Sequence, residues 1–150
     1  MKTESYPRAY LYRRIVQAKI FIDNNYADNI PLKKISGEAF FSKFHFNRLF
    51  KSIYGKTPHQ YLTSVRLDKA QLLLKEGKPV SEVCFLVGFE SVGSFSRLFK
   101  HTIGVSPTAF VSNQAARKKD IAVNPLKFIP ACIAYKNGWM ENSNFEQIFT

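Results

Sequence analysis

The chain has 150 residues and a hydrophobic content of 45%, enough for one folded domain or two very small ones and too apolar for global disorder. Its net charge of +11 indicates a polyanionic partner, with solubility as the alternative reason for such a charge. Lys and Arg outnumber Asp and Glu by 17 to 8 in residues 1–111 and by 5 to 3 in residues 112–150, so the basic surface is expected mainly in the first part.

Several kinds of site have no signature in the sequence. The N-terminus lacks the apolar segment of a secretory signal and no apolar run could span a membrane, so no membrane partner is expected. Cys84 and Cys132 form no metal or redox motif, and His45, His59 and His101 lack ligand spacing. There is no phosphate loop, catalytic carboxylate pair or nucleophile elbow. We predict no enzyme activity, no cofactor and no metal, with a small helical enzyme as an alternative.

The first predicted elements are two short helices, Leu32–Ala39 and a basic helix that follows the connection FFSK. In the basic helix, apolar residues recur at i, i+3, i+4 and i+7, as on one face of an amphipathic helix: Phe46, Leu49, Phe50 and Ile53. Gly55 follows, where a helix end needs positive φ. Phe40 stands where a turn glycine would be expected.

A longer helix is predicted over Pro58–Lys75. Thr57 and Gln60 have the spacing of a capping box, and proline is tolerated in the first turn. Apolar residues cover more than one side of this helix, so it should be buried on more than one side: Tyr61, Leu62, Val65, Leu67, Ala70, Leu72, Leu73 and Leu74. At about 1.5 Å per residue it would be a rigid strut of about 27 Å.

A second pair of short helices is predicted after the strut. The first, Ser81–Val87, has three apolar residues expected to face inward: Val83, Leu86 and Val87. Gly88 supplies a tight turn, and a second amphipathic helix follows with the stripe Phe95, Leu98, Phe99 and Thr102. Gly104 stops this helix, and Ser106-Pro107 can begin a closing helix.

The second pair is a near copy of the first. FNRLFKSIYGKTP at residues 46–58 returns as FSRLFKHTIGVSP at residues 95–107, 49 residues later. Two short helices joined by a tight turn, the second basic on its outer face, make a helix-turn-helix. One turn of B-DNA is roughly 34 Å, so the strut could hold two recognition helices in successive major grooves.

The segments LKKISGEAFFSKFHFNRLFKSIYGKTPHQYLTSVRLDKAQLLL and VSEVCFLVGFESVGSFSRLFKHTIGVSPTAF resemble the DNA-binding domain of AraC/XylS-type bacterial transcription regulators, over about Tyr10–Val111. The resemblance implies an all-α, homeodomain-like fold of seven helices, in which a long linking helix joins two helix-turn-helix units. It also implies a regulator that binds double-stranded DNA at a bipartite, asymmetric promoter site, often as an activator that touches RNA polymerase.

The resemblance also implies which residues contact DNA. In the first recognition helix the base-reading positions are Phe44, Asn47 and Arg48, with Ser42 and Lys43 near phosphates. In the second they are Val92, Gly93, Ser94 and Arg97. Chemistry supports part of this independently, because Arg can donate two hydrogen bonds to guanine and Asn can read adenine. His45 can touch a base edge or a phosphate, while Lys51 and Lys100 are expected as phosphate neighbours or plain surface.

We expect a DNA-binding domain over residues 8–111 and a C-terminal extension over residues 112–150. Only about nine residues precede the first expected helix, so no attached sensor domain is expected. Two units in one chain predict a monomer on one DNA site. Two cysteines without a disulfide pattern fit a reducing cytoplasm, and the resemblance implies a bacterial one. A binding module of another kind, whose extension recruits a protein, is the second alternative.

The extension contains an apolar run with two prolines, which predicts an extended segment and a strand over Lys127–Tyr135. Trp139 and Phe145 are costly to leave in water, so we expect the extension to fold back on the domain. A dimer contact and a strip that binds a partner or ligand are the alternatives. Cys132 has apolar neighbours and is expected to pack rather than to sense redox state.

Overall fold

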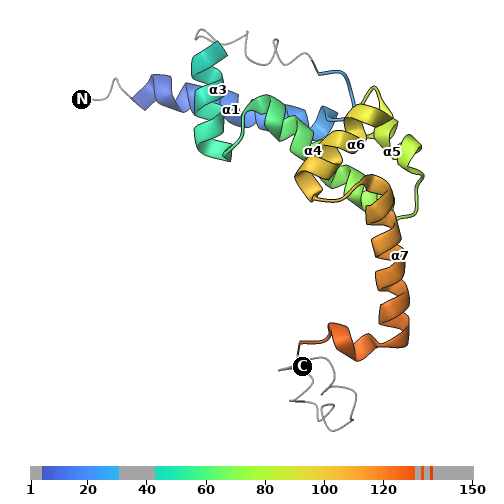
Figure 1. The fold of residues 1–150 in the computed structure, drawn as a ribbon. Helices are drawn as coiled ribbons and strands as arrows, with labels where there is room; N and C mark the ends of the chain where they lie inside the picture. Colours follow the sequence, from blue (N-terminus) through green and yellow to red (C-terminus); the bar gives the residue numbers. More distant parts are fainter. Residues whose placement is uncertain (1–4, 31–42, 131–132, 134–135, 137–150) are drawn as a thin grey trace. The chain divides into compact units, whose positions relative to one another are not determined.

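The computed structural model describes residues 5–30 and 43–130, together with Ile133 and Lys136. By its internal contacts the chain forms two compact units, Met1–Pro107 and Thr108–Thr150. The regular secondary structure of the described residues is all helical (Figure 1), and short turns join some of the helices. These helices are α1 (Ser5–Asn25), α3 (Lys43–Tyr54), α4 (Pro58–Lys75), α5 (Val80–Leu86), α6 (Val92–Ile103), α7 (Pro107–Val123) and the 3-10 helix η1 (Pro125–Phe128). No helix in these ranges has the length and apolarity to cross a membrane.

The all-α prediction is confirmed, with six of the seven implied α-helices lying in the described residues. The remaining one, predicted over Leu32–Ala39, lies outside the described residues, as do Phe40 and Ser42. The first helix begins at Ser5 rather than near Tyr10, a little more than one turn earlier than the resemblance implied.

The linking helix α4 has the predicted bounds, Pro58–Lys75. Its start is a capping box: the backbone N–H of Gln60 donates to the Thr57 hydroxyl oxygen at 3.3 Å, and the Thr57 N–H donates to the Gln60 amide oxygen at 3.0 Å. Gly77, with φ +91°, follows the helix and ends it. Local signals at both ends therefore set the length of the strut.

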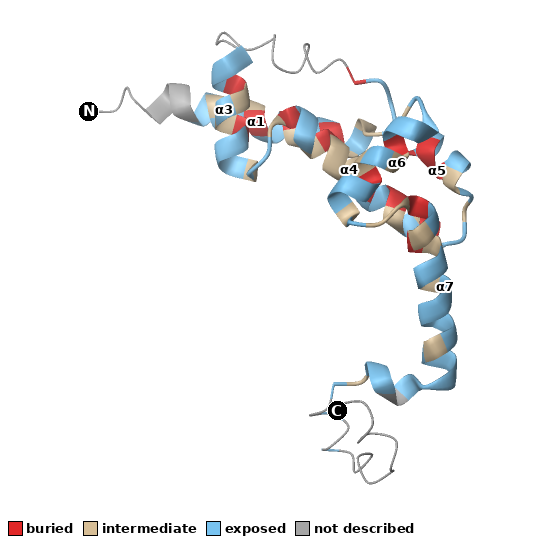
Figure 2. Ribbon diagram, in the orientation of Figure 1, coloured by how far each residue is buried: buried red, intermediate tan, exposed pale blue. Residues whose placement is uncertain are grey.

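A first core joins α1, α3 and the start of α4 (Figure 2), and it contains Ile15, Ala18, Ile22, Ile30, Phe46, Phe50 and Leu62. Each fully buried Phe or Ile contributes about 1.5–3 kcal/mol. The Tyr61 hydroxyl donates to an Asp23 carboxylate oxygen at 2.8 Å, which fastens α4 to α1. Ile53, predicted on the buried stripe, is 39% exposed, whereas its neighbour Tyr54 packs against the core at this end of α3.

The remaining buried residues of the first unit belong mainly to α4, α5 and α6, and we call them the second core: Leu67, Ala70, Leu74, Val83, Cys84, Val87, Phe95 and Phe99. The Phe95 ring lies 5.6 Å from that of Phe99. Burial raises the pKa of the Cys84 thiol, which disfavours the reactive thiolate.

Two residues predicted to face this core do not. Leu72 is 53% exposed, because it lies on the side of α4 opposite to Ala70 and Leu74. Leu86 is 44% exposed, because Val83, Cys84 and Val87 already fill the buried side of the short helix α5.

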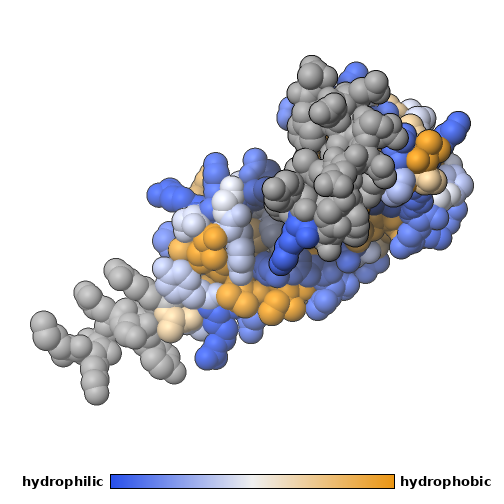
Figure 3. All heavy atoms as spheres, turned by 90° about the horizontal axis from the view of Figure 1, so that it is seen from below, coloured by the Kyte–Doolittle hydropathy of each residue, from blue (hydrophilic) through white to orange (hydrophobic). Residues whose placement is uncertain are grey.

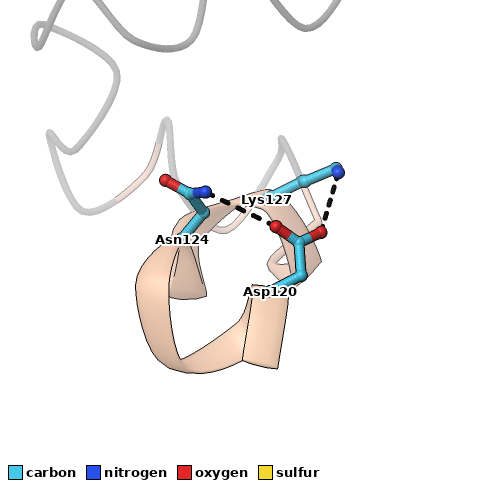
Figure 4. A network of polar contacts seen from close by, with 3 residues as sticks. All are labelled: Asp120, Asn124 and Lys127. Atoms are coloured by element: carbon cyan, nitrogen blue, oxygen red, sulfur yellow. Dashed lines mark hydrogen bonds and ion pairs between the residues drawn. The ribbon is translucent and has the colours of Figure 1, made fainter. Parts of the chain in front are cut away.

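The second unit contains most of α7 and the turn after it. The Asp120 carboxylate accepts hydrogen bonds from Lys127 Nζ at 2.8 Å and from Asn124 Nδ2 at 3.4 Å (Figure 4). These hydrogen bonds lower the pKa of Asp120, and the bond from Lys127 has the larger effect. They hold η1 against the end of α7, where a proline with its fixed φ suits a helical turn.

The strand predicted over Lys127–Tyr135 is wrong in its described part. Residues 125–128 form η1, and the Ile133 N–H donates to the Pro130 carbonyl oxygen at 2.9 Å, which is a turn and not an extended segment. Trp139, Phe145 and Cys132 lie outside the described residues, and the expectation that the extension folds back stays a prediction.

Candidate nucleic-acid interface

Helix α3 has one buried and one exposed face. Phe46 and Phe50 enter the first core, and the opposite face carries most of the predicted DNA-binding residues of the first unit. Lys43, Phe44, His45, Arg48 and Lys51 are exposed, and Asn47 is half-buried. No acidic residue occurs in α3, so this face presents cations without carboxylates on the same helix.

Phe44 stands out among these residues because 79% of its side chain is exposed. Figure 3 shows one face of the molecule, on which hydrophobic side chains stand among hydrophilic ones. A phenylalanine this exposed gains little from the protein's own core, so its apolar surface is free for a partner.

Helix α6 begins with a side-chain cap and ends at a glycine. The backbone N–H of Ser94 donates to the Ser91 hydroxyl oxygen at 3.2 Å, and Gly104 closes the helix with φ +93°. Phe95 and Phe99 are its buried residues, as Phe46 and Phe50 are those of α3. α6 also contains no acidic residue.

The predicted DNA-binding residues of α6 are all exposed: Val92, Gly93, Ser94, Arg97 and Lys100. A Cβ atom added at Gly93 would meet no atom within 4 Å, and its φ is not positive. Nothing in the protein's own packing therefore requires glycine there. A helix glycine costs stability relative to alanine, so open space in front of Gly93 suits the close approach of a partner.

The two helices are built alike. Lys43–Tyr54 and Val92–Ile103 are both 12 residues long and 49 residues apart, so Arg48 corresponds to Arg97 and Lys51 to Lys100. α3 contacts α4 directly, and α6 contacts α5, which contacts α4. The predicted residues that the structure describes thus lie on two equivalent helices, and all of them except the half-buried Asn47 are exposed.

Sequence reasoning missed Arg66, a half-buried arginine in the middle of α4. The signal was available, because Arg66 directly precedes Leu67 in a helix with apolar residues on more than one side, and a buried arginine needs polar partners. Its partners lie 38 and 40 residues away, beyond the reach of any local pattern.

Comparisons with known proteins agree with this geometry. The family model of a helix-turn-helix domain matches residues 35–113. The chain is 42% identical over 91 residues to the probable transcriptional regulator LumQ of Photobacterium leiognathi, covering 60% of this chain and 37% of LumQ. It is 32% identical over 88 residues to the multiple antibiotic resistance protein MarA of Salmonella typhimurium, covering 58% of this chain and 69% of MarA.

Solved structures give the same picture. The DNA-binding domain of AdpA, solved in complex with a target DNA, is 26% identical and has a TM-score of 0.65, covering 70% of this chain and 96% of that one. The C-terminal domain of AraT from Geobacillus stearothermophilus is 25% identical with a TM-score of 0.61, covering 67% of this chain and 84% of that one. The chain therefore has relatives in both sequence and fold among DNA-binding regulators.

Proposed function

Because the chain belongs to the AraC/XylS-type helix-turn-helix family of DNA-binding transcription regulators, we propose that it reads a bipartite, asymmetric site in double-stranded DNA. The observation that carries this proposal is the presence of two equivalent exposed basic helices, α3 and α6, in one compact unit. Each enters the major groove of one half-site.

The residues of α3 divide by chemistry. Arg48 donates two hydrogen bonds to a guanine, Asn47 reads an adenine, and the exposed ring of Phe44 contacts a thymine methyl group. Lys43 and Lys51 contact phosphates, and His45 contacts a base edge or a phosphate. Ser42, which precedes α3 and lies outside the described residues, is proposed to lie near a phosphate as well. This helix supplies most of the base reading.

The residues of α6 offer fewer base contacts. Arg97 reads a guanine as Arg48 does, and Val92 touches a thymine methyl group. Gly93 lets the helix approach DNA closely, Ser94 can hydrogen-bond to a base edge, and Lys100 lies near a phosphate. The second half-site is therefore defined by fewer base pairs than the first.

The domain over residues 8–111 binds DNA, and the extension over residues 112–150 is not required for site preference. One chain occupies one site, since it already has two reading helices and needs no symmetric partner. We propose that the protein acts in the bacterial cytoplasm as an activator that contacts RNA polymerase at the promoter. Its bacterial relatives include a probable transcriptional regulator and a protein named as a transcriptional activator, which supports this proposal.

Selection of DNA from a random pool, followed by gel-shift titration at two salt concentrations, tests the proposal. We expect a non-palindromic site with halves about one helical turn apart, and affinity that falls with salt at a log–log slope of about −0.9 per neutralised phosphate. An affinity that does not change with salt, together with failure to select any DNA sequence, would refute sequence-specific DNA binding. A complex of two proteins on one minimal site in analytical ultracentrifugation would refute the monomer.

A further inference from the structure

Arg66 connects α4 to two segments that are distant in the sequence. Its Nε donates to the Tyr26 carbonyl oxygen at 2.7 Å, and its Nη2 donates to the Asp28 carbonyl oxygen at 2.9 Å. Its guanidinium carbon lies 5.7 Å from the centroid of the Phe89 ring, in the turn between α5 and α6. One side chain thus joins the segment after α1 to the turn of the second helix-turn-helix.

The backbone makes contact at the same place. A Cβ atom on Gly88 would lie 2.7 Å from the Ala27 carbonyl oxygen and 2.9 Å from that of Tyr26. Gly88 also has φ +92°, so both its conformation and this close approach require glycine. The turn before α6 therefore packs directly against the end of the first half. We call Arg66, Gly88, Phe89 and residues 26–28 the Arg66 junction.

Both sides of the Arg66 junction are anchored in a core. Tyr26 packs against the first core, and Lys69 Nζ lies 5.9 Å from the centroid of its ring. On the other side, the Phe89 ring lies 5.3 Å from that of Phe95, which is buried in α6. A continuous series of contacts runs from the first core through Arg66 to the second recognition helix.

The chemistry of the Arg66 side chain suits this position better than that of a lysine. A planar guanidinium can serve two carbonyl oxygens and lie over an aromatic ring at once, whereas the ammonium of lysine is a point charge. Burial lowers the pKa of the Arg66 guanidinium, and the nearby charge of Glu90 opposes this shift. The side chain remains charged near neutral pH, because the ordinary pKa of arginine is far above 7. Its hydrogen bonds to both carbonyl oxygens are therefore charge-assisted.

We propose that Arg66 is a positioning residue that sets which spacing between the two DNA half-sites the protein accepts. This rests on the proposed function. With α4 as the only connection, either half could rock about that helix. The Arg66 junction is a second attachment away from the axis of α4, so it removes this freedom and presents α3 and α6 in one fixed arrangement.

A change in spacer length tests the arrangement, because one base pair shifts a half-site by about 3.4 Å and turns it by about 34°. The probes are the selected site and versions with one or two base pairs inserted or deleted between its halves. We expect the full chain to lose about tenfold or more in affinity for each one-base-pair change, since base contacts in one half are then lost.

Arg66→Met keeps the apolar stem and removes both hydrogen bonds, and Arg66→Lys keeps the charge. For Arg66→Met we expect the ratio between the best spacing and its neighbours to fall to within about threefold, while affinity for an isolated first half-site is unchanged. Arg66→Lys should fall between the wild type and Arg66→Met. Lys78→Met is the control, because it removes one charge from an exposed ion pair of 3.7 Å outside the junction. It should keep the spacing profile.

The outcomes separate the two proposals. Failure of the wild-type chain to select any site would overturn the proposed function. A wild-type chain that selects a site yet accepts spacer changes with less than threefold loss would overturn the positioning role alone, and this measurement needs no variant. A folded Arg66→Met or Arg66→Lys protein with the wild-type spacing profile would also overturn it.

Discussion

The two recognition helices share their buried faces and differ in their exposed ones. Phe46 and Phe50 in α3 match Phe95 and Phe99 in α6, and all four are buried. At the helix starts, however, Lys43-Phe44 corresponds to Val92-Gly93, so α3 has a large exposed ring at the position where α6 has no side chain. Packing against a core restricts the residues of the buried faces, whereas the exposed faces are free of this restriction and can differ.

The halves also differ in how they are held. The first has aromatic contacts between α3 and α4, with the Phe50 and Tyr61 rings 5.7 Å apart. The second depends on Gly88 fitting against backbone carbonyl groups. The second half should therefore tolerate little change at Gly88.

The largest expected effect is that of Gly88→Ala on stability. The positive φ alone costs about 1–2 kcal/mol, and the forced contact with the Tyr26 and Ala27 carbonyl oxygens adds about 1–3 kcal/mol. Gly77→Ala is a matched control, because Gly77 has φ +91° and no atom within 4 Å of its added Cβ. Urea unfolding should show Gly88→Ala as the less stable variant. Equal losses would contradict the tight contact at the Arg66 junction.

The difference in base reading should appear in the two arginine variants. Arg48→Ala should weaken binding by about 1–3 kcal/mol and relax preference at one or two base pairs of the first half-site. Arg97→Ala should cost the same or less, with a smaller change in the rest of its half-site. Scanning the selected site base by base measures both. More information in the second half-site, or an unchanged profile for Arg48→Ala, would reverse the assignment.

The attachment of α4 to the first half can be weakened by Tyr61→Phe. Loss of the hydrogen bond to Asp23 should cost about 0.5–1.5 kcal/mol. Burial first, and then the hydrogen bond to Asp23, raise the pKa of Tyr61, so its contribution is complete below pH 10 and is lost as the pH rises through the folded-state value. Unfolding at neutral and alkaline pH should therefore show the two proteins converging at high pH. A constant difference would contradict this role.

The smallest effect is expected at Gly93. Gly93→Ala should raise the free energy of unfolding by about 0.4–1 kcal/mol, because its φ is not positive and the added methyl group meets no atom. The same variant should bind DNA more weakly if the helix start approaches the DNA closely. Thermal unfolding and gel-shift titration on one preparation would measure both changes. Stabilisation with unchanged binding would place Gly93 away from the DNA.

The sequence by itself determined much of this protein. The bounds of α4, its capping box, the stops at Gly55 and Gly104 and the burial of the four repeated phenylalanines all follow from signals within a few residues. The same short patterns carried the resemblance to the AraC/XylS family and the choice of exposed residues on α3 and α6.

Only the tertiary structure decided the rest. Exposure of Ile53, Leu72 and Leu86 depends on which sides of their helices the neighbouring helices cover, which periodicity does not contain. At the end of α7, Asp120 and Lys127 favour a 3-10 turn over the strand that the apolar run predicted. The Arg66 junction joins residues 38 and 40 positions apart, and such contacts exist only after α1, α4 and the turn at Gly88 have been packed together.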